Sequence, residues 1–135
     1  MSKMWWMMNS RLCFLIAGLS GALTVGLGAF GSHGLKDVLS PYLLDVYQTA
    51  VQYQMWHTLA LFGCGILLRN SMSKGVSYAA LLFTIGIIFF SGSLYALVFT
   101  GIKWFGPITP LGGLCFISGW LTLAVSTYRL TEVSK

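Results

Sequence analysis

The sequence predicts an all-α integral membrane protein, a bundle of four transmembrane helices with both termini in the cytoplasm. Only 11 of the 135 residues are Lys, Arg, Asp or Glu, which is 8%, whereas a soluble domain carries about 25%. Hydrophobic residues make up 56% of the chain, and the mean hydropathy is +0.78. Uncharged runs long enough to cross a bilayer recur along the sequence. This composition excludes a water-soluble domain, which could not bury so much apolar surface, and a disordered chain.

We expect residues 1–135 to form one domain with spans at about 12–31, 48–68, 77–100 and 109–128. The first run is uncharged and contains Gly18, Ala22 and Gly26, which are four residues apart and therefore share a helix face. Small residues of this kind let helices in lipid approach closely, within the bundle or between copies. The same run resembles a signal peptide, with small residues ahead of Ser32, but it exceeds the usual 7–15 residues of a signal core. Trp5 and Trp6 before it suit the membrane interface.

The second span is the least apolar of the four. A loop is expected over 32–45, and the strictly apolar stretch 58–68 is too short to cross hydrocarbon. A spanning helix must therefore carry Gln52, Gln54 and His57 into the membrane. We expect these side chains to face other helices or a wet cavity rather than lipid.

The third and fourth spans follow in the same way. Residues 77–100 carry no charge but include Ser91, Ser93 and Tyr95. After a turn at 101–106, Thr109 is the expected N-cap of the last helix and Pro110 suits its first turn. Cys115 and Gly119 form a second stripe of small residues on that helix.

The basic residues predict the orientation. Six of the eight lie in the two tails and in the turn between the second and third spans, which places both termini inside by the positive-inside rule. The net charge of +5 is thus mostly a topology signal, and no concentrated basic face indicates nucleic acid binding. The three cysteines, Cys13, Cys64 and Cys115, are expected to be buried free thiols.

This topology gathers the polar residues of the spans at the outer side of the bundle. The candidate binding residues are His33, Gln52, Gln54, His57, Ser91 and Tyr95. Gln52 and Gln54 point about 160° apart on a helix, whereas Ser91 and Tyr95 share a face and are expected to partner His57 or Gln54.

Two interpretations of each histidine stay open. His57 shares a face with Tyr53 and Cys64, and it is either a proton relay, ligand contact or metal ligand, or a neutral imidazole bonded to Ser91, Tyr95 or a backbone carbonyl of another helix. His33 lies either in a ligand-binding turn permitted by the glycines at 31 and 34, or in water beyond a helix C-cap at Gly31.

The sequence predicts no catalytic residue, because no triad has a well-placed acid and no phosphate-binding motif has the right context. It predicts no cofactor or resident metal, because His33 and His57 are expected at different depths in the membrane. The absence of an acid inside the spans argues against a proton-coupled cation exporter. We expect the outer polar pocket to bind a small molecule, a lipid or a partner. The alternatives are a small transporter or channel subunit, or a membrane redox or enzyme subunit that uses His57. Besides the bilayer, a second copy or a membrane complex is an expected partner.

Four motifs in order carry a family resemblance: residues 28–36, 49–57, 92–95 and 106–113, followed by Gly119 and Trp120. They resemble the family of small bacterial inner-membrane proteins typified by YgdD, a domain of unknown function with a similar animal branch. The resemblance covers about 12–128 and departs at Ser32, where alanine is expected, and at Trp56, where tyrosine is expected. It implies a four-helix protein of the bacterial inner membrane and no particular reaction.

Overall fold

A computed structural model describes residues 8–130 of the chain. The expectations for Trp5, Trp6 and the outermost charges of both tails lie outside these residues. Every described segment of regular structure is helical, and the long helices are joined by short connections. The all-helical prediction is therefore confirmed for this part of the chain.

The first helix, α1 (Ser10–Phe30), begins where the side chain of Asn9 accepts a hydrogen bond from the Leu12 N–H at 2.9 Å. It does not end at Gly31 as expected, because a π-helical turn, Gly31–Leu35, continues it without a break. Gly31 has ordinary right-handed helical angles and is not a C-cap. Its lack of a side chain instead makes room for the Tyr47 ring, since a Cβ would lie 2.5 Å from Tyr47 Cε1.

The second helix, α2 (Pro41–Asn70), begins earlier than the expected loop 32–45 allows. Ser40 caps it through its hydroxyl, which accepts from the Leu43 N–H, and Pro41 takes the first turn, where no N–H partner is needed. At 1.5 Å per residue its 30 residues extend about 45 Å, ample to cross a bilayer.

The third span is one rod of three segments: α3 (Lys74–Gly86), a π-helical turn (Ile87–Ser91) and α4 (Gly92–Thr100). Gly101 ends it in the left-handed conformation, with φ of +70°, which favours glycine. A 3-10 helix, Lys103–Ile108, leads directly into α5 (Thr109–Leu130). Thr109 is therefore already helical and is not the expected N-cap; its hydroxyl bonds to Ser93 instead.

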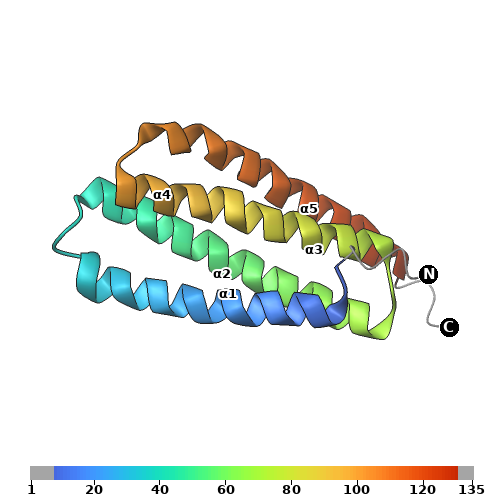
Figure 1. Cartoon of the computed structure of the whole chain (residues 1–135). Coiled ribbons are helices and arrows are strands. Elements are labelled where there is room, and N and C mark those ends of the chain that lie inside the picture. The colour runs from blue at the N-terminus through green and yellow to red at the C-terminus, as the bar shows by residue number, and fades with distance from the viewer. Residues whose placement is uncertain (1–7, 131–135) are drawn as a thin grey trace.

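The long helices lie side by side in an antiparallel row (Figure 1), with α1 and α5 flanking α2 and the rod that contains α3 and α4. Between Met8 and Leu130, α1 and α5 share no extended interface, so the row does not close into a ring. We call the end that holds 31–41 and 101–108 the loop end. The opposite end, the terminal end, holds the start of α1, the turn at 71–73 and the close of α5.

Three helical segments in the described range are long and apolar enough to cross a membrane: Ser10–Leu35, Lys74–Thr100 and Lys103–Leu130. The α2 helix is not among them, because its polar residues lower its hydropathy. All described charged side chains are exposed and lie in connections or within five residues of a helix end. The chain is thus a helical membrane protein, with three spans supported by composition.

The interior has an apolar cluster towards each end. The larger one, at the terminal end, is centred on Leu61, Cys64, Val76 and Phe83, and the smaller one, at the loop end, on Leu35, Tyr47 and Val98. Between them lie buried polar side chains, which are Thr24, Gln54, His57, Thr58, Ser91 and Ser93. The polar residues of the middle of the protein therefore form an interior layer.

Close packing between helices depends on glycines of α2, α3 and α5 rather than on the expected stripe of α1. A Cβ at Gly112 would lie 2.3 Å from the Phe90 backbone nitrogen, and one at Gly119 would lie 2.8 Å from the Phe83 ring. By contrast, a Cβ at Gly18 or Gly26 would meet nothing within 4 Å. Within the described chain, the Gly18 stripe is thus not a packing face, whereas Gly119 is.

We predict that Gly112→Ala destabilises the protein by about 1–3 kcal/mol, because the new methyl group must push α5 away from backbone that cannot yield. Gly18→Ala should be neutral or stabilising, since its methyl group meets open space and alanine favours helix. Unfolding by sodium dodecyl sulfate, followed by circular dichroism, measures both. Equal effects of the two changes would contradict the packing described here.

Candidate functional site

Gln54 is the centre of the buried polar layer, with only 3% of its surface exposed. Its Oε1 accepts from the Tyr95 hydroxyl at 2.7 Å, and its Nε2 donates to Ser20 Oγ at 3.2 Å and to the Ser20 carbonyl at 3.4 Å. Ser20 Oγ in turn lies 2.7 Å from Thr58 Oγ1. One amide therefore links α1, α2 and α4, and the expected pairing of Tyr95 with Gln54 is present.

Serine side chains make the remaining contacts of this layer. Ser91 is fully buried and donates to the Ala50 carbonyl at 2.7 Å, not to His57 or Gln54. Ser93 bonds to Thr109 at 2.6 Å, which joins α4 to the start of α5. These bonds stabilise contacts between helices.

His57 is 4% exposed, and both of its ring nitrogens have partners. Nδ1 lies 2.7 Å from the Tyr53 carbonyl, and the indole N–H of Trp120 donates to Nε2 at 3.1 Å. A carbonyl can only accept and an indole N–H can only donate, so the network assigns the proton to Nδ1 of a neutral ring. His57 is thus anchored to its own helix and to α5, not to Ser91 or Tyr95.

Aromatic rings enclose the His57 imidazole. It stacks on Phe116 with 3.5 Å between centroids and an angle of 8°, and Tyr53 and Phe83 lie nearby. In this arrangement neither ring nitrogen is available to a metal or a migrating proton. Over residues 8–130, no group of three His, Cys, Asp or Glu side chains is placed to hold a metal ion.

The six candidate residues do not meet in one cavity. Gln54, His57, Ser91 and Tyr95 form the interior layer, whereas Gln52 and His33 are exposed. Gln52 and Gln54 thus face opposite ways, as their spacing predicts, and His33 lies on the exposed side of the π-helical turn. A ligand-binding role for any of the six stays a prediction.

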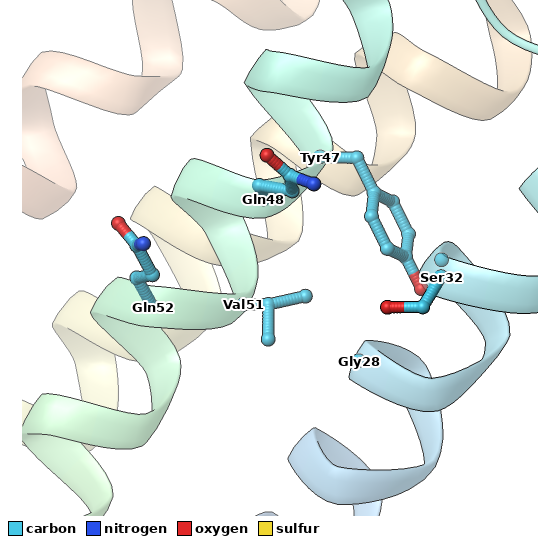
Figure 2. A pocket seen from close by; sticks show the side chains of 7 residues that line it. Gly28, Ser32, Tyr47, Gln48, Val51 and Gln52 are labelled. Atoms are coloured by element: carbon cyan, nitrogen blue, oxygen red, sulfur yellow. The ribbon is translucent and has the colours of Figure 1, made fainter. Parts of the chain in front are cut away.

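A cavity of about 310 Å³ lies between α1 and α2 at the loop end. It is lined by Gly28 of α1, by residues of the π-helical turn and by residues of α2; the lining side chains are those of Ser32, Tyr47, Gln48, Val51 and Gln52. Figure 2 shows Val51 in the gap between the two helices, Gln48 and Gln52 one turn apart on α2, and Ser32 on the facing α1 side. We call this the α1–α2 polar cavity.

The polar side chains of this cavity, apart from Tyr47, are unpartnered. Tyr47 donates its hydroxyl proton to the Leu27 carbonyl. Neither the amides of Gln48 and Gln52 nor the hydroxyl of Ser32 bonds to any group between Met8 and Leu130. The cavity therefore offers free donors and acceptors from two helices.

A larger cavity, about 520 Å³, lies at the loop end among the connections and is lined by residues that include Ser40, Tyr42 and Lys103. Its Ser40 hydroxyl is already engaged in capping α2. The Tyr42 hydroxyl and the Lys103 amine are free among the described residues, but the α1–α2 polar cavity offers more free polar side chains, which are Ser32, Gln48 and Gln52, and none of them is charged.

Sequence reasoning missed Gln48, Ser32 and Trp120 as site residues. Gln48 was detectable, because it lies four residues before Gln52 and so shares its helix face. Ser32 occurs beside His33 in a turn that was considered only for the histidine. The bond from Trp120 to His57 depends on how α5 packs on α2, which no local pattern reveals.

We predict that His57 and Trp120 stabilise the fold as a coupled pair. A double-mutant cycle with His57→Leu and Trp120→Phe should give a coupling of about 0.6–1.7 kcal/mol, the range of hydrogen bonds between membrane helices. Unfolding in sodium dodecyl sulfate measures each variant. Additive effects would mean that the indole and imidazole do not bond.

Comparison with known proteins places the chain in a family. Residues 27–113 match the model described as "Protein of unknown function (DUF423)". A UPF0382 membrane protein of Staphylococcus aureus is 45% identical over 119 residues, which cover 88% of this chain and 97% of that protein. One from Staphylococcus saprophyticus is 46% identical and covers 89% and 99%.

The UPF0382 inner membrane protein YgdD of Escherichia coli is 34% identical over 123 residues, 91% of this chain and 94% of that protein. No solved structure matches. These relatives confirm the resemblance carried by the four motifs. The chain belongs to the DUF423, or UPF0382, family of membrane proteins, whose activity is unknown.

Proposed function

We propose that this protein binds an amphiphile with an uncharged, hydrogen-bonding headgroup in the α1–α2 polar cavity. In this proposal all four long helices span the inner membrane, both termini are cytoplasmic and the cavity lies at the outer surface. The start of α1 and the close of α5 both lie at the terminal end of the bundle, which supports an even number of membrane crossings. The excess of basic residues in the tails and the 69–74 turn supports the orientation.

The observation that carries the proposal is the unpartnered state of Gln48, Gln52 and Ser32. If the terminal boundary of the hydrocarbon lies near Leu68, a core of about 30 Å ends 20 residues away, near Gln48. Gln52 then lies about 6 Å inside, where an amide without a partner is costly. A bound headgroup that supplies donors and acceptors removes this cost.

The lining of the cavity also indicates the charge of the headgroup. None of the cavity residues is ionisable near neutral pH. Asp45 lies three residues before Gln48, on the same side of α2, and it is exposed. The exposed Lys36 lies four residues after Ser32, so the rim carries one charge of each sign and neither charge is selected. Uncharged hydroxyl or amide groups therefore fit best.

Transport and His57-based redox chemistry have less support. Within residues 8–130 the ring nitrogens of His57 are both engaged. The terminal half of the interior is mostly apolar, and its buried Ser77 hydroxyl donates to the Met8 carbonyl. Headgroup binding uses groups that are free in the structure.

The topology is tested by labelling single cysteines in a variant without Cys13, Cys64 and Cys115. Thiols introduced by Ser32→Cys and Lys103→Cys should react from outside intact cells with a membrane-impermeant reagent. Ser71→Cys should react only after the membrane is opened. Labelling of Ser71→Cys from outside intact cells would contradict the proposed orientation. If Ser32→Cys and Ser71→Cys were labelled from the same side of the membrane, α2 would not span it.

Binding is tested by native mass spectrometry of the full chain in detergent, titrated with mono-oleoylglycerol. The double variant Gln48→Leu/Gln52→Leu should weaken binding about tenfold, because two neutral hydrogen bonds contribute about 0.5–1.5 kcal/mol each. Its stability should be unchanged or higher, since no bond within the described chain is lost.

Asn70→Leu is the matched control, because it removes an exposed amide from the other end of the same helix. It should leave mono-oleoylglycerol binding unchanged. The proposal fails if the double variant binds as tightly as the wild type, or if Asn70→Leu weakens binding equally.

A further inference from the structure

We infer that the ligand is a membrane lipid, one hydrocarbon chain of which lies in a groove along α1 and α2 below the polar cavity. The inference rests on the proposed function and names the ligand class. A second cavity of about 290 Å³ lies between the same two helices. Its lining is almost wholly apolar and includes Phe14, Gly18, Ala22, Met55, Leu59 and Phe62. We call it the apolar groove.

The two cavities lie on one face of the α1–α2 pair. On α2, Gln48 and Gln52 of the polar cavity are followed at intervals of three or four by Met55, Leu59 and Phe62 of the apolar groove. Such a series forms a single stripe along a helix. On α1, Gly21 of the groove and Gly28 of the polar cavity are seven apart and share a face in the same way. The polar and apolar sections therefore continue one another.

The depth of the stripe matches one leaflet. From Gln48 to Leu59 is 11 residues, or about 16 Å at 1.5 Å per residue, and half of a hydrocarbon core is about 15 Å. Beyond Leu59, the rings of Phe62 and Phe14 pack with centroids 5.1 Å apart. This aromatic pair closes the groove near the middle of the membrane.

Glycines leave the groove open along α1. A Cβ at Gly18 would meet nothing within 4 Å, and one at Gly21 would only touch Thr58 Cγ2 at 3.7 Å. The absence of side chains here is not required by packing between α1 and α2, but it leaves room for an occupant. An occupant that is polar at the membrane surface and apolar over one leaflet is a lipid.

The test uses the full chain in phosphatidylcholine nanodiscs with a monoacylglycerol that carries a photoreactive diazirine in the middle of its chain. Cross-links should map to the apolar groove, chiefly to Met55 and Leu59, and an excess of mono-oleoylglycerol should compete them away. Gly18→Leu should lower this labelling at least fivefold, because Gly18 lines the groove, its new Cβ meets no atom within 4 Å and the larger side chain takes up space in the groove.

Gly26→Leu is the matched control. It makes the same change on the same helix, at an exposed position that lines neither cavity and has equal space for a Cβ. Its labelling should equal that of the wild type. Thermal unfolding of both variants checks that they are folded. Competition by mono-oleoylglycerol in the wild type tests, without any substitution, whether the labelling is specific.

Each result decides between the two proposals. Loss of labelling in Gly18→Leu but not in Gly26→Leu supports the groove. Retained labelling in Gly18→Leu, while Gln48→Leu/Gln52→Leu loses it, overturns the groove and leaves the headgroup site standing. The reverse pattern keeps the groove and overturns the headgroup site. Labelling that spreads over exposed residues such as Leu114 and Leu121 and is not reduced by mono-oleoylglycerol overturns the lipid inference.

Discussion

The constraint on which the structure depends is that hydrocarbon supplies no hydrogen-bond partner, so polar side chains at membrane depth must find one in the protein. Gln54 meets this requirement with both ends of its amide, through Tyr95 on one side and Ser20 on the other. The hydrogen bonds of the Gln54 amide thereby hold α1 and α4 in position against α2. Similar bonds between membrane helices average about 0.6 kcal/mol, so their main effect is to select one arrangement.

The same constraint explains why α2 looks the least like a membrane span and yet occupies the interior of the row. Its buried polar residues reduce its hydropathy, and α1 and the α3–α4 rod shield them from lipid. The edge helices expose apolar side chains, and α2 does the same at Leu59, Phe62 and Ile66, so only one face of α2 carries the buried polar residues. Composition thus reports the environment of a helix as much as its ability to cross.

Much of the fold follows from the sequence because it depends on local periodicity. The uncharged runs locate three of the four long helical segments. The spacing of Gln52 and Gln54 shows that only one of these two side chains faces the interior. The pairing of Tyr95 with Gln54 was among the expected ones because Tyr95 lies on the face shared with Ser91. The bond from Trp120 to His57 and the contact of Gly31 with Tyr47 depend on the rotation and register of two helices. The π-helical turns likewise have no local signal, which is why the sequence predicts a helix end at Gly31 where the structure continues the helix.

The contrast between His57 and Gln52 shows which polar residues leave capacity for a ligand. An ionisable side chain inside a membrane is the usual first candidate for function, yet His57 has both nitrogens bonded and a ring stacked on Phe116. Gln52 draws less attention in a sequence, but it is exposed, lies in the half of α2 nearer the loop end and is free of partners among the described residues. A group whose bonds are complete can bind a ligand only by losing one, whereas Gln52 gains a bond by binding. The free amides of Gln48 and Gln52 are therefore the reason why the proposed ligand site is placed at the α1–α2 polar cavity rather than at His57.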